Sequence, residues 1–335
     1  MKILVTLPEN TFKKNTFFTE KSKRRIEELG EVIYNPYERE LTADELAEMI
    51  KVIDILITGW QTEKVQGKIL DNADSLKIIA HTGGTIAPNV CDEVFERGII
   101  VLSGNPVFAE SVAEGCLCYI MSVLRDVVKY SETMRLGGWK DTEYYNEGIM
   151  DKTVGIVGFG MIARFLVKML QPFHCKIKIF SRYLTDEEAE KYNAKKATLN
   201  EIFESCDVIS IHASGGEKNY HLVDEEQIKK MKDGALIVNT ARGPIIDEEA
   251  LIKELETLRI RAALDVYKKE PPEKNSKLRF LPNVLTMPHM GGPTIDRREY
   301  VTLALADEIE EFLNGKKEGF YCEITPSYAK NMSSK

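Results

Sequence analysis

The sequence has few of the residues that build metal sites or disulfide frameworks. Its 335 residues include five histidines and six cysteines, and neither type recurs at a ligand or framework spacing. We therefore expect no metal site and free thiols, as in a reducing cytoplasm. No apolar run approaches the ~20 residues that span a bilayer, and Met1–Pro8 is typical of a first strand rather than a signal peptide. The sequence thus predicts a cytoplasmic protein without a membrane role.

An excess of positive charge is also missing. The chain carries 45 Lys and Arg against 53 Asp and Glu, which gives a net charge of −8. Nucleic-acid binding therefore has no electrostatic support. Internal repeats and low-complexity segments are missing too, and the length favours two domains of ordinary globular composition.

What the sequence does contain is a strand–turn–helix–strand pattern in residues 151–182. The turn reads Gly158-Phe-Gly160-Met-Ile-Ala163, and Gly-x-Gly-x-x-Ala in this setting is the dinucleotide-binding fingerprint. We expect Gly158 to form the tight turn and Gly160 to let the backbone approach a pyrophosphate. The amides of Met161 and Ile162, in the first turn of the helix, would bind its oxygens. The alternative is a turn whose glycines serve packing alone.

Strand and helix patterns alternate on both sides of this unit. Five strand patterns separated by helices precede residue 105, which predicts a complete parallel α/β domain ahead of the fingerprint. Further strand patterns follow residue 182 and extend the nucleotide domain. A long helix is expected over Glu110–Lys129 as the first crossing between domains. The polar segment 131–150, with Trp139, Tyr144 and Tyr145, would anchor a partner subunit or serve as a covering flap.

Polar residues follow three of the later strand patterns. Ligands of open parallel sheets bind beyond the carboxyl ends of the strands, where Arg242, Glu270 and His289 are expected. Arg242 can hold a carboxylate by two parallel hydrogen bonds. His289 can donate a proton to a developing alkoxide, and Glu270 beside it would favour the imidazolium form. Taken singly, each residue could instead be an ordinary surface or capping residue.

The segments around these residues carry a family resemblance. Val238–Pro244, Ala263–Pro271 and Pro288–Gly292 resemble the three signature segments of the D-isomer-specific 2-hydroxyacid dehydrogenases, and Ser111–Glu114 also fits. The resemblance covers nearly the whole chain. It implies an α/β fold in which a Rossmann dinucleotide-binding domain, residues 105–292, is inserted into a flavodoxin-like substrate domain built from residues 1–104 and 293–335. It also implies a homodimer and a small 2-keto or D-2-hydroxy acid as substrate.

The resemblance further implies a role for each site residue. Arg242 would bind the substrate, His289 would be the acid/base and Glu270 its partner, while the backbone N–H groups of Thr82 and Gly83 would bind the substrate carboxylate. The implied contacts with the remainder of the cofactor come from residues at strand ends, namely Ala213, Thr240, Ala241 and Asp265.

Three departures from the family pattern bear on specificity. Ser181-Arg182 stands where the acidic residue that accepts from the ribose 2′-hydroxyl is expected, which favours NADP over NAD unless Arg182 is merely exposed. Thr85–Pro88 replaces the usual Asp-bearing continuation of the substrate loop. Ser214–Tyr220 lacks the usual proline and threonine, so adenine contacts there are in doubt.

Two other functions remain open at this point. The same fold could serve as a non-catalytic dinucleotide sensor or corepressor-like scaffold, although such a protein has no need of a proton donor beside the nicotinamide. The same site could also oxidise another small anion, such as formate or phosphite. The loops expected to choose the substrate are residues 7–12, 59–61 and 81–88.

Overall fold

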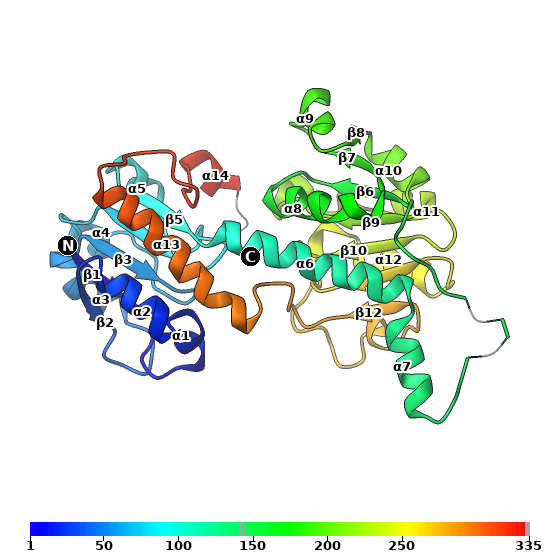
Figure 1. Cartoon of the computed structure of the whole chain (residues 1–335), viewed down its shortest axis with the longest axis horizontal. Coiled ribbons are helices and arrows are strands. Elements are labelled where there is room, and N and C mark those ends of the chain that lie inside the picture. Colours follow the sequence, from blue (N-terminus) through cyan, green and yellow to red (C-terminus); the bar gives the residue numbers. More distant parts are fainter. Residues whose placement is uncertain (141, 144, 332–335) are drawn as a thin grey trace. The chain divides into compact units, whose positions relative to one another are not determined.

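The computed structural model describes residues 1–335 except 141, 144 and 332–335. The chain divides into two compact units, which are Met1–Ala109 with Pro293–Lys335 (unit 1) and Glu110–Gly292 (unit 2). The first boundary therefore lies within a helix, between Ala109 and Glu110, rather than at residue 105. Figure 1 follows the chain from the blue N-terminal strands of unit 1 through unit 2 and back to the orange and red C-terminal helices.

Unit 1 is built on a five-stranded parallel sheet with the order β2-β1-β3-β4-β5, the flavodoxin-like order. Short apolar runs form the strands because both faces of the sheet are covered by helices. The strands are β1 (Lys2–Val5), β2 (Glu31–Tyr34), β3 (Ile55–Thr58), β4 (Ile78–His81) and β5 (Ile100–Ser103). The helices are α1 (Phe12–Phe17), α2 (Glu20–Glu27), α3 (Ala43–Met49), η1 (Ile50–Val52), α4 (Lys68–Asp71), α5 (Asp92–Glu96), η6 (Ile295–Arg297), α13 (Arg298–Leu313) and α14 (Pro326–Asn331).

Unit 2 is built on a seven-stranded parallel sheet with the order β12-β11-β10-β9-β6-β7-β8, a Rossmann order with one added strand. The fingerprint strand β6 pairs with both β7 and β9, so the chain reverses direction across the sheet at this point. The strands are β6 (Thr153–Val157), β7 (Lys176–Phe180), β8 (Ala194–Lys196), β9 (Val208–Ile211), β10 (Leu236–Asn239), β11 (Arg261–Leu264) and β12 (Val284–Thr286).

Helices cover both faces of this second sheet (Figure 1). One apolar core contains Val154, Ile156 and Val238 of the sheet with Ala163 and Leu166 of the fingerprint helix, and a second core lies on the opposite face. The helices are α6 (Asn105–Leu124), α7 (Val127–Arg135), α8 (Met161–Leu170), η2 (Gln171–Phe173), α9 (Asp186–Glu190), α10 (Leu199–Ser205), η3 (Glu217–Asn219), α11 (Glu225–Lys230), η4 (Gly243–Ile245), α12 (Glu248–Leu255) and η5 (Lys277–Arg279). The structure thus confirms the expected two-domain α/β fold.

The expected helix over 110–129 is two helices. α6 ends at Leu124, and α7 begins after Asp126, whose φ of 51° turns the chain. By length and composition α6 could cross a membrane, contrary to the expectation that no segment approaches that length. Its residues Ala113, Cys116 and Ile120 are buried in the core of unit 2, as in a core helix.

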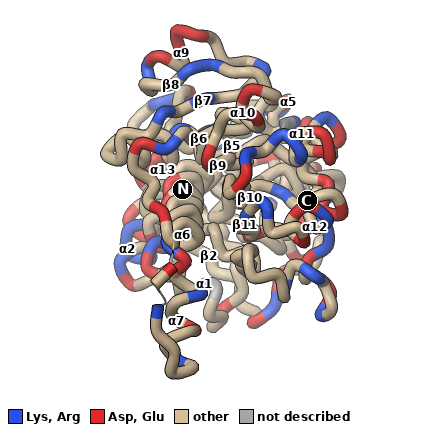
Figure 2. Tube along the Cα trace, turned by 90° about the vertical axis from the view of Figure 1, so that its right-hand side faces the viewer, with Lys and Arg blue, Asp and Glu red and all other residues tan. Residues whose placement is uncertain are grey.

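The C-terminal residues form a last helix, and part of the segment after α7 lies outside the described residues. Residues 326–331 form α14, and the last four residues lie outside the described chain. Tyr144, expected to anchor a partner, is likewise outside the described residues. Figure 2 shows acidic and basic positions interspersed along the chain.

Candidate active site

The glycine turn after β6 has the backbone that the fingerprint requires. Gly158 has a φ of 93°, and a Cβ on it would lie 2.5 Å from the backbone nitrogen of Ala213, so no other residue fits without displacing the chain. Gly160 is the N-cap of α8, with no side-chain cap and open space around the position of a Cβ. The first amides of α8 are thus left for an anion, and this turn fits a pyrophosphate.

The strand beside this turn ends in a serine and an arginine. Ser181 follows the last residue of β7 directly, and Arg182 is exposed. The Arg182 Nη2 donates a hydrogen bond to the carbonyl oxygen of Lys218 at 3.0 Å. No carboxylate of the described chain pairs with Arg182. The position that would hold an acid for a ribose hydroxyl therefore carries a positive charge.

A buried asparagine shapes the loop after β10. The Asn239 Oδ1 accepts from the Ala241 amide at 3.0 Å, and its Nδ2 donates to the Arg242 carbonyl oxygen at 3.0 Å. Thr240 between them is buried. The Arg242 Nη1 donates to the Ala241 carbonyl oxygen at 2.7 Å, which folds the side chain back over the loop. Burial lowers the pKa of Arg242, and the charge of Glu270 opposes that shift, so the two groups interact electrostatically.

Glu270 and His289 meet although 19 positions separate them in the chain. The His289 Nδ1 lies 2.7 Å from the Glu270 Oε2. The other carboxylate oxygen, Oε1, accepts from the Tyr267 amide at 3.1 Å, which fixes the carboxylate plane. The His289 side chain is 52% exposed. Because Nδ1 is held by the carboxylate, Nε2 is the ring nitrogen available to a ligand.

Asp265 holds the loop that carries the histidine. Its buried carboxylate accepts hydrogen bonds from the amides of Met290 and Gly291, each at 2.7 Å. Its carbonyl oxygen accepts from the His289 amide at 3.0 Å. His289 itself has a φ of 54°, a left-handed conformation that costs about 1–3 kcal/mol outside glycine. Asp265, expected beside the nicotinamide, therefore also fixes the imidazole's position, which spacing alone did not indicate.

The candidate residues of unit 1 follow β4. The Thr82 amide and hydroxyl both donate to the Thr58 carbonyl oxygen at 2.9 Å, so the Thr82 amide is not available to a substrate, contrary to expectation. The amides of Gly83 and Gly84 donate to no acceptor of the described chain. A Cβ on Gly83 would lie 2.4 Å from the His81 Nε2 and 2.6 Å from the Trp60 Nε1. Only glycine therefore fits against these two rings.

One half-buried histidine of unit 2 was not among the expected site residues. His212 directly follows β9, and its Nε2 lies 2.8 Å from the Ser210 hydroxyl, which in turn lies 3.2 Å from the Cys116 thiol. Burial lowers the pKa of His212 to about 4 and raises that of Cys116 to about 11, so both groups are neutral near pH 7. The position of His212 at a strand end was the available signal in the sequence.

In the described part of the chain, no three His, Cys, Asp or Glu residues are placed to hold a metal.

The fold and the turn together define a dinucleotide-binding α/β protein. Residues 117–291 match the model of the D-isomer specific 2-hydroxyacid dehydrogenase, NAD binding domain. Among similar proteins, the glyoxylate reductase of Thermococcus litoralis is 33% identical over 88% of this chain and 93% of its own length. The hydroxypyruvate reductase of Thermotoga maritima is 34% identical over 84% of this chain and 94% of its own length.

A longer relative and a solved structure complete the comparison. The D-3-phosphoglycerate dehydrogenase of Methanocaldococcus jannaschii is 32% identical over 94% of this chain, which spans 58% of that protein. The structure of D-2-hydroxyisocaproate dehydrogenase superposes with a TM-score of 0.80 at 22% identity, covering 97% of this chain and 100% of that one. The chain belongs to the D-isomer-specific 2-hydroxyacid dehydrogenase family. It is therefore an enzyme, an oxidoreductase of 2-keto and 2-hydroxy acids with an NAD(P)-binding domain.

Proposed function

We propose that this protein reduces a small 2-keto acid to the D-2-hydroxy acid with NADPH. The observation that carries the proposal is the Glu270–His289 pair, with a 2.7 Å contact on Nδ1 that leaves Nε2 for a substrate. NADPH, when bound, supplies the hydride. The His289 Nε2 gives a proton to the carbonyl oxygen as negative charge develops there, and Glu270 stabilises the imidazolium beforehand.

Arg242 and Gly83 are assigned to the substrate. The half-buried Arg242 guanidinium has no carboxylate partner in the described chain and would bind the keto acid's carboxylate and carbonyl. The Gly83 amide is a further candidate donor to a substrate carboxylate. The nicotinamide side of the cofactor is assigned to Thr240, Ala241 and Asp265, and its phosphates to the turn at Gly158 and Gly160.

The NADP preference is supported by Ser181 and Arg182 at the end of β7. An arginine is a good partner for a 2′-phosphate, and the position offers no carboxylate to a free 2′-hydroxyl. Glyoxylate and hydroxypyruvate are the first substrates to test, because similar proteins carry those names.

The decisive experiment mixes the purified full-length chain with NADPH or NADH and a panel of 2-keto acids. Loss of reduced-cofactor absorbance with glyoxylate or hydroxypyruvate is the expected result. A protein that binds the cofactor tightly but turns over no keto acid, formate or phosphite would instead be the dinucleotide sensor or corepressor-like scaffold considered above.

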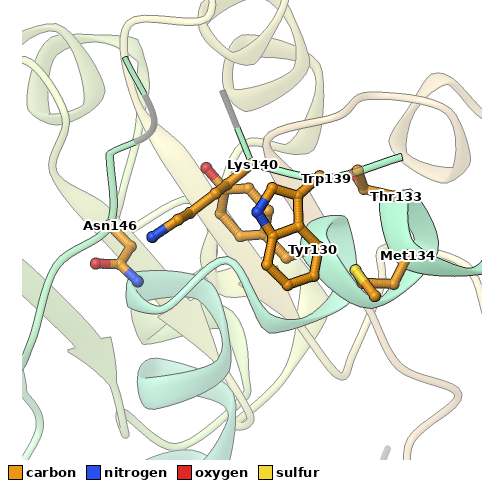
Figure 3. Close-up of a pocket in the computed structure, with 6 residues that line it drawn as sticks. All are labelled: Tyr130, Thr133, Met134, Trp139, Lys140 and Asn146. Atoms are coloured by element: carbon orange, nitrogen blue, oxygen red, sulfur yellow. The ribbon is translucent and has the colours of Figure 1, made fainter. Parts of the chain in front are cut away.

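The homodimer is proposed on the surface around α7. None of the residues of α7 is buried, and large apolar side chains on and after it are exposed, Leu136 by 81% and Trp139 by 72%. Figure 3 shows the hollow between Trp139, Tyr130 and Met134. Exposed aromatic groups of this kind anchor partner subunits. We expect Leu136→Glu to give a monomer in analytical ultracentrifugation, while Val52→Glu, at an exposed position of unit 1, leaves the dimer intact.

We propose that the protein is located in the cytoplasm. All six cysteines are free in the structure, as is typical of a reducing compartment.

A further inference from the structure

A second basic residue, Lys218, has its backbone in contact with Arg182 in unit 2. The fingerprint strand β6 pairs with β7 on one side and β9 on the other. Arg182 follows β7, and Lys218 lies in η3, in the loop that follows β9. The two strands that flank the glycine turn therefore each lead to a positively charged side chain. We propose that Lys218 is a second ligand of the 2′-phosphate of NADPH, acting together with Arg182.

Direct contacts hold the loop after β7 against the loop after β9. The Arg182 Nη2 donates to the carbonyl oxygen of Lys218 at 3.0 Å, so the guanidinium and the Lys218 backbone touch. The Asn219 Nδ2 donates to the Ser214 carbonyl oxygen at 2.8 Å and closes the loop 214–219 from within. The Lys218 backbone is therefore fixed beside Arg182, and only its side chain has to settle around a ligand.

The charge of this pair is not neutralised by the protein. Both side chains are exposed, and within the described residues neither has a carboxylate at ion-pair distance. Arg164 of α8 differs, because Glu188 accepts its hydrogen bond at 2.5 Å and Tyr192 lies against it. Arg164 is thus neutralised, whereas the positive charges of Arg182 and Lys218 remain available to an anion.

The chemistry of a phosphate monoester suits such a pair. A 2′-phosphate carries close to two negative charges and three acceptor oxygens, so one guanidinium leaves charge and lone pairs unmatched. An ammonium on a flexible stem supplies the second charge without a fixed geometry. A ribose with free hydroxyls gains little from either cation, so the pair discriminates between the two cofactors. This inference rests on the proposed preference for NADPH.

The test measures dissociation constants of NADPH, NADH and adenosine 2′,5′-bisphosphate for the full-length chain by titration calorimetry. Lys218→Met keeps the backbone carbonyl that Arg182 uses and removes only the charge. We expect it to weaken NADPH and the bisphosphate by about tenfold and NADH by less than twofold. Lys253→Met, on the exposed side of α12, is the matched control and should change none of them.

The outcomes separate this inference from the proposed function. If Arg182→Met lowers the NADPH-to-NADH preference and Lys218→Met does not, Lys218 has no such role, and the NADPH preference stands. If the native chain binds both cofactors equally, both the preference and the role of Lys218 are overturned. If the chain binds the bisphosphate through both cations yet reduces no keto acid, the site stands and the proposed reaction does not.

Discussion

The carboxyl edges of the two parallel sheets differ in chemistry although their architecture is alike. In unit 1, β3 and β4 lead to rings and hydroxyls, with Trp60 edge-on to Phe17 at 5.5 Å and to Phe108 at 6.0 Å. In unit 2, β10, β11 and β12 lead to a guanidinium, a carboxylate and an imidazole. The same layered fold therefore presents mainly aromatic rings and hydroxyls after these strands of unit 1 and charged groups after those of unit 2.

Each edge also has a histidine bonded to a hydroxyl. The His81 Nδ1 lies 2.9 Å from the Thr58 Oγ1, and the His212 Nε2 lies 2.8 Å from the Ser210 Oγ. Unit 2 also has a histidine of a second kind, His289, which is paired with a carboxylate and is 52% exposed. On the proposed function, proton transfer would take place in unit 2, and unit 1 would contribute substrate contacts without proton transfer.

The largest expected effect tests the assignment of proton transfer. His289→Gln should lower kcat by about 10²–10⁴-fold, because the amide cannot supply the proton, and should leave the NADPH dissociation constant within about twofold. Steady-state kinetics and fluorescence titration measure the two quantities. His221→Gln is the matched control, since His221 also has a positive φ, of 48°, and lies near Asp247. Equal losses in both variants would mean that His289 is structural.

A smaller effect is expected at Arg242. Arg242→Lys keeps the charge but loses the two parallel hydrogen bonds to a carboxylate, and kcat/KM for the keto acid should fall by about 10–100-fold. Cofactor affinity, measured by titration, should not change. A lysine variant as active as the native protein would show that charge alone suffices and would weaken the contrast between the edges.

At the edge of unit 1 the expected change is in KM. Gly83→Ala places a Cβ against the rings of His81 and Trp60, so the amide beside it should shift and KM should rise by about tenfold. Steady-state kinetics should show kcat much less affected, since no proton moves at this edge. Gly84→Ala is the control, because the atoms nearest to its Cβ would belong to Phe108, at 3.4 Å, an ordinary van der Waals distance. A fall in kcat with constant KM would contradict the division of roles.

The smallest effect is a pH dependence of stability from His212. Burial lowers its pKa to about 4, whereas an unfolded histidine titrates near 6.5. The unfolded chain therefore binds the proton first as pH falls. His212 therefore leaves the free energy of unfolding unchanged above about pH 6.5. As the pH is lowered to about 4, that free energy falls by ~2 kcal/mol. Denaturant-induced unfolding measured across that pH range should show this loss of stability, and His212→Gln should flatten the pH dependence. A parallel pH profile in the variant would refute this account.

Most of the fold could be predicted from the sequence, because its strands are short β-branched runs between capped helices. Both parallel sheets and the fingerprint turn followed from such patterns. The break between α6 and α7 did not, because it rests on the left-handed Asp126 with no glycine or proline to signal it. The boundary inside α6 was likewise hidden, since a continuous helix gives no compositional change at the residue where one unit ends and the next begins.

Of the candidate site, too, one part could be predicted from the sequence and another part could not. Arg242, Glu270 and His289 could be named because each follows a strand, and strand ends of a parallel sheet share an edge. The loss of the Thr82 amide to Thr58 and the hold of Asp265 on the histidine loop could not, because in both cases backbone amides meet acceptors from a separate strand end only after folding. Lys218 was hidden for the same reason. Its nearness to Arg182 exists only after folding.

The left-handed backbone at His289 has a consequence for how this enzyme can change over time. A glycine or asparagine there would relax the loop at no steric cost, so the substitutions that most relieve the chain also remove its proposed proton donor. Without selection for activity, such substitutions would therefore give a more stable but inactive protein. Continued selection for turnover is what would keep the imidazole in place.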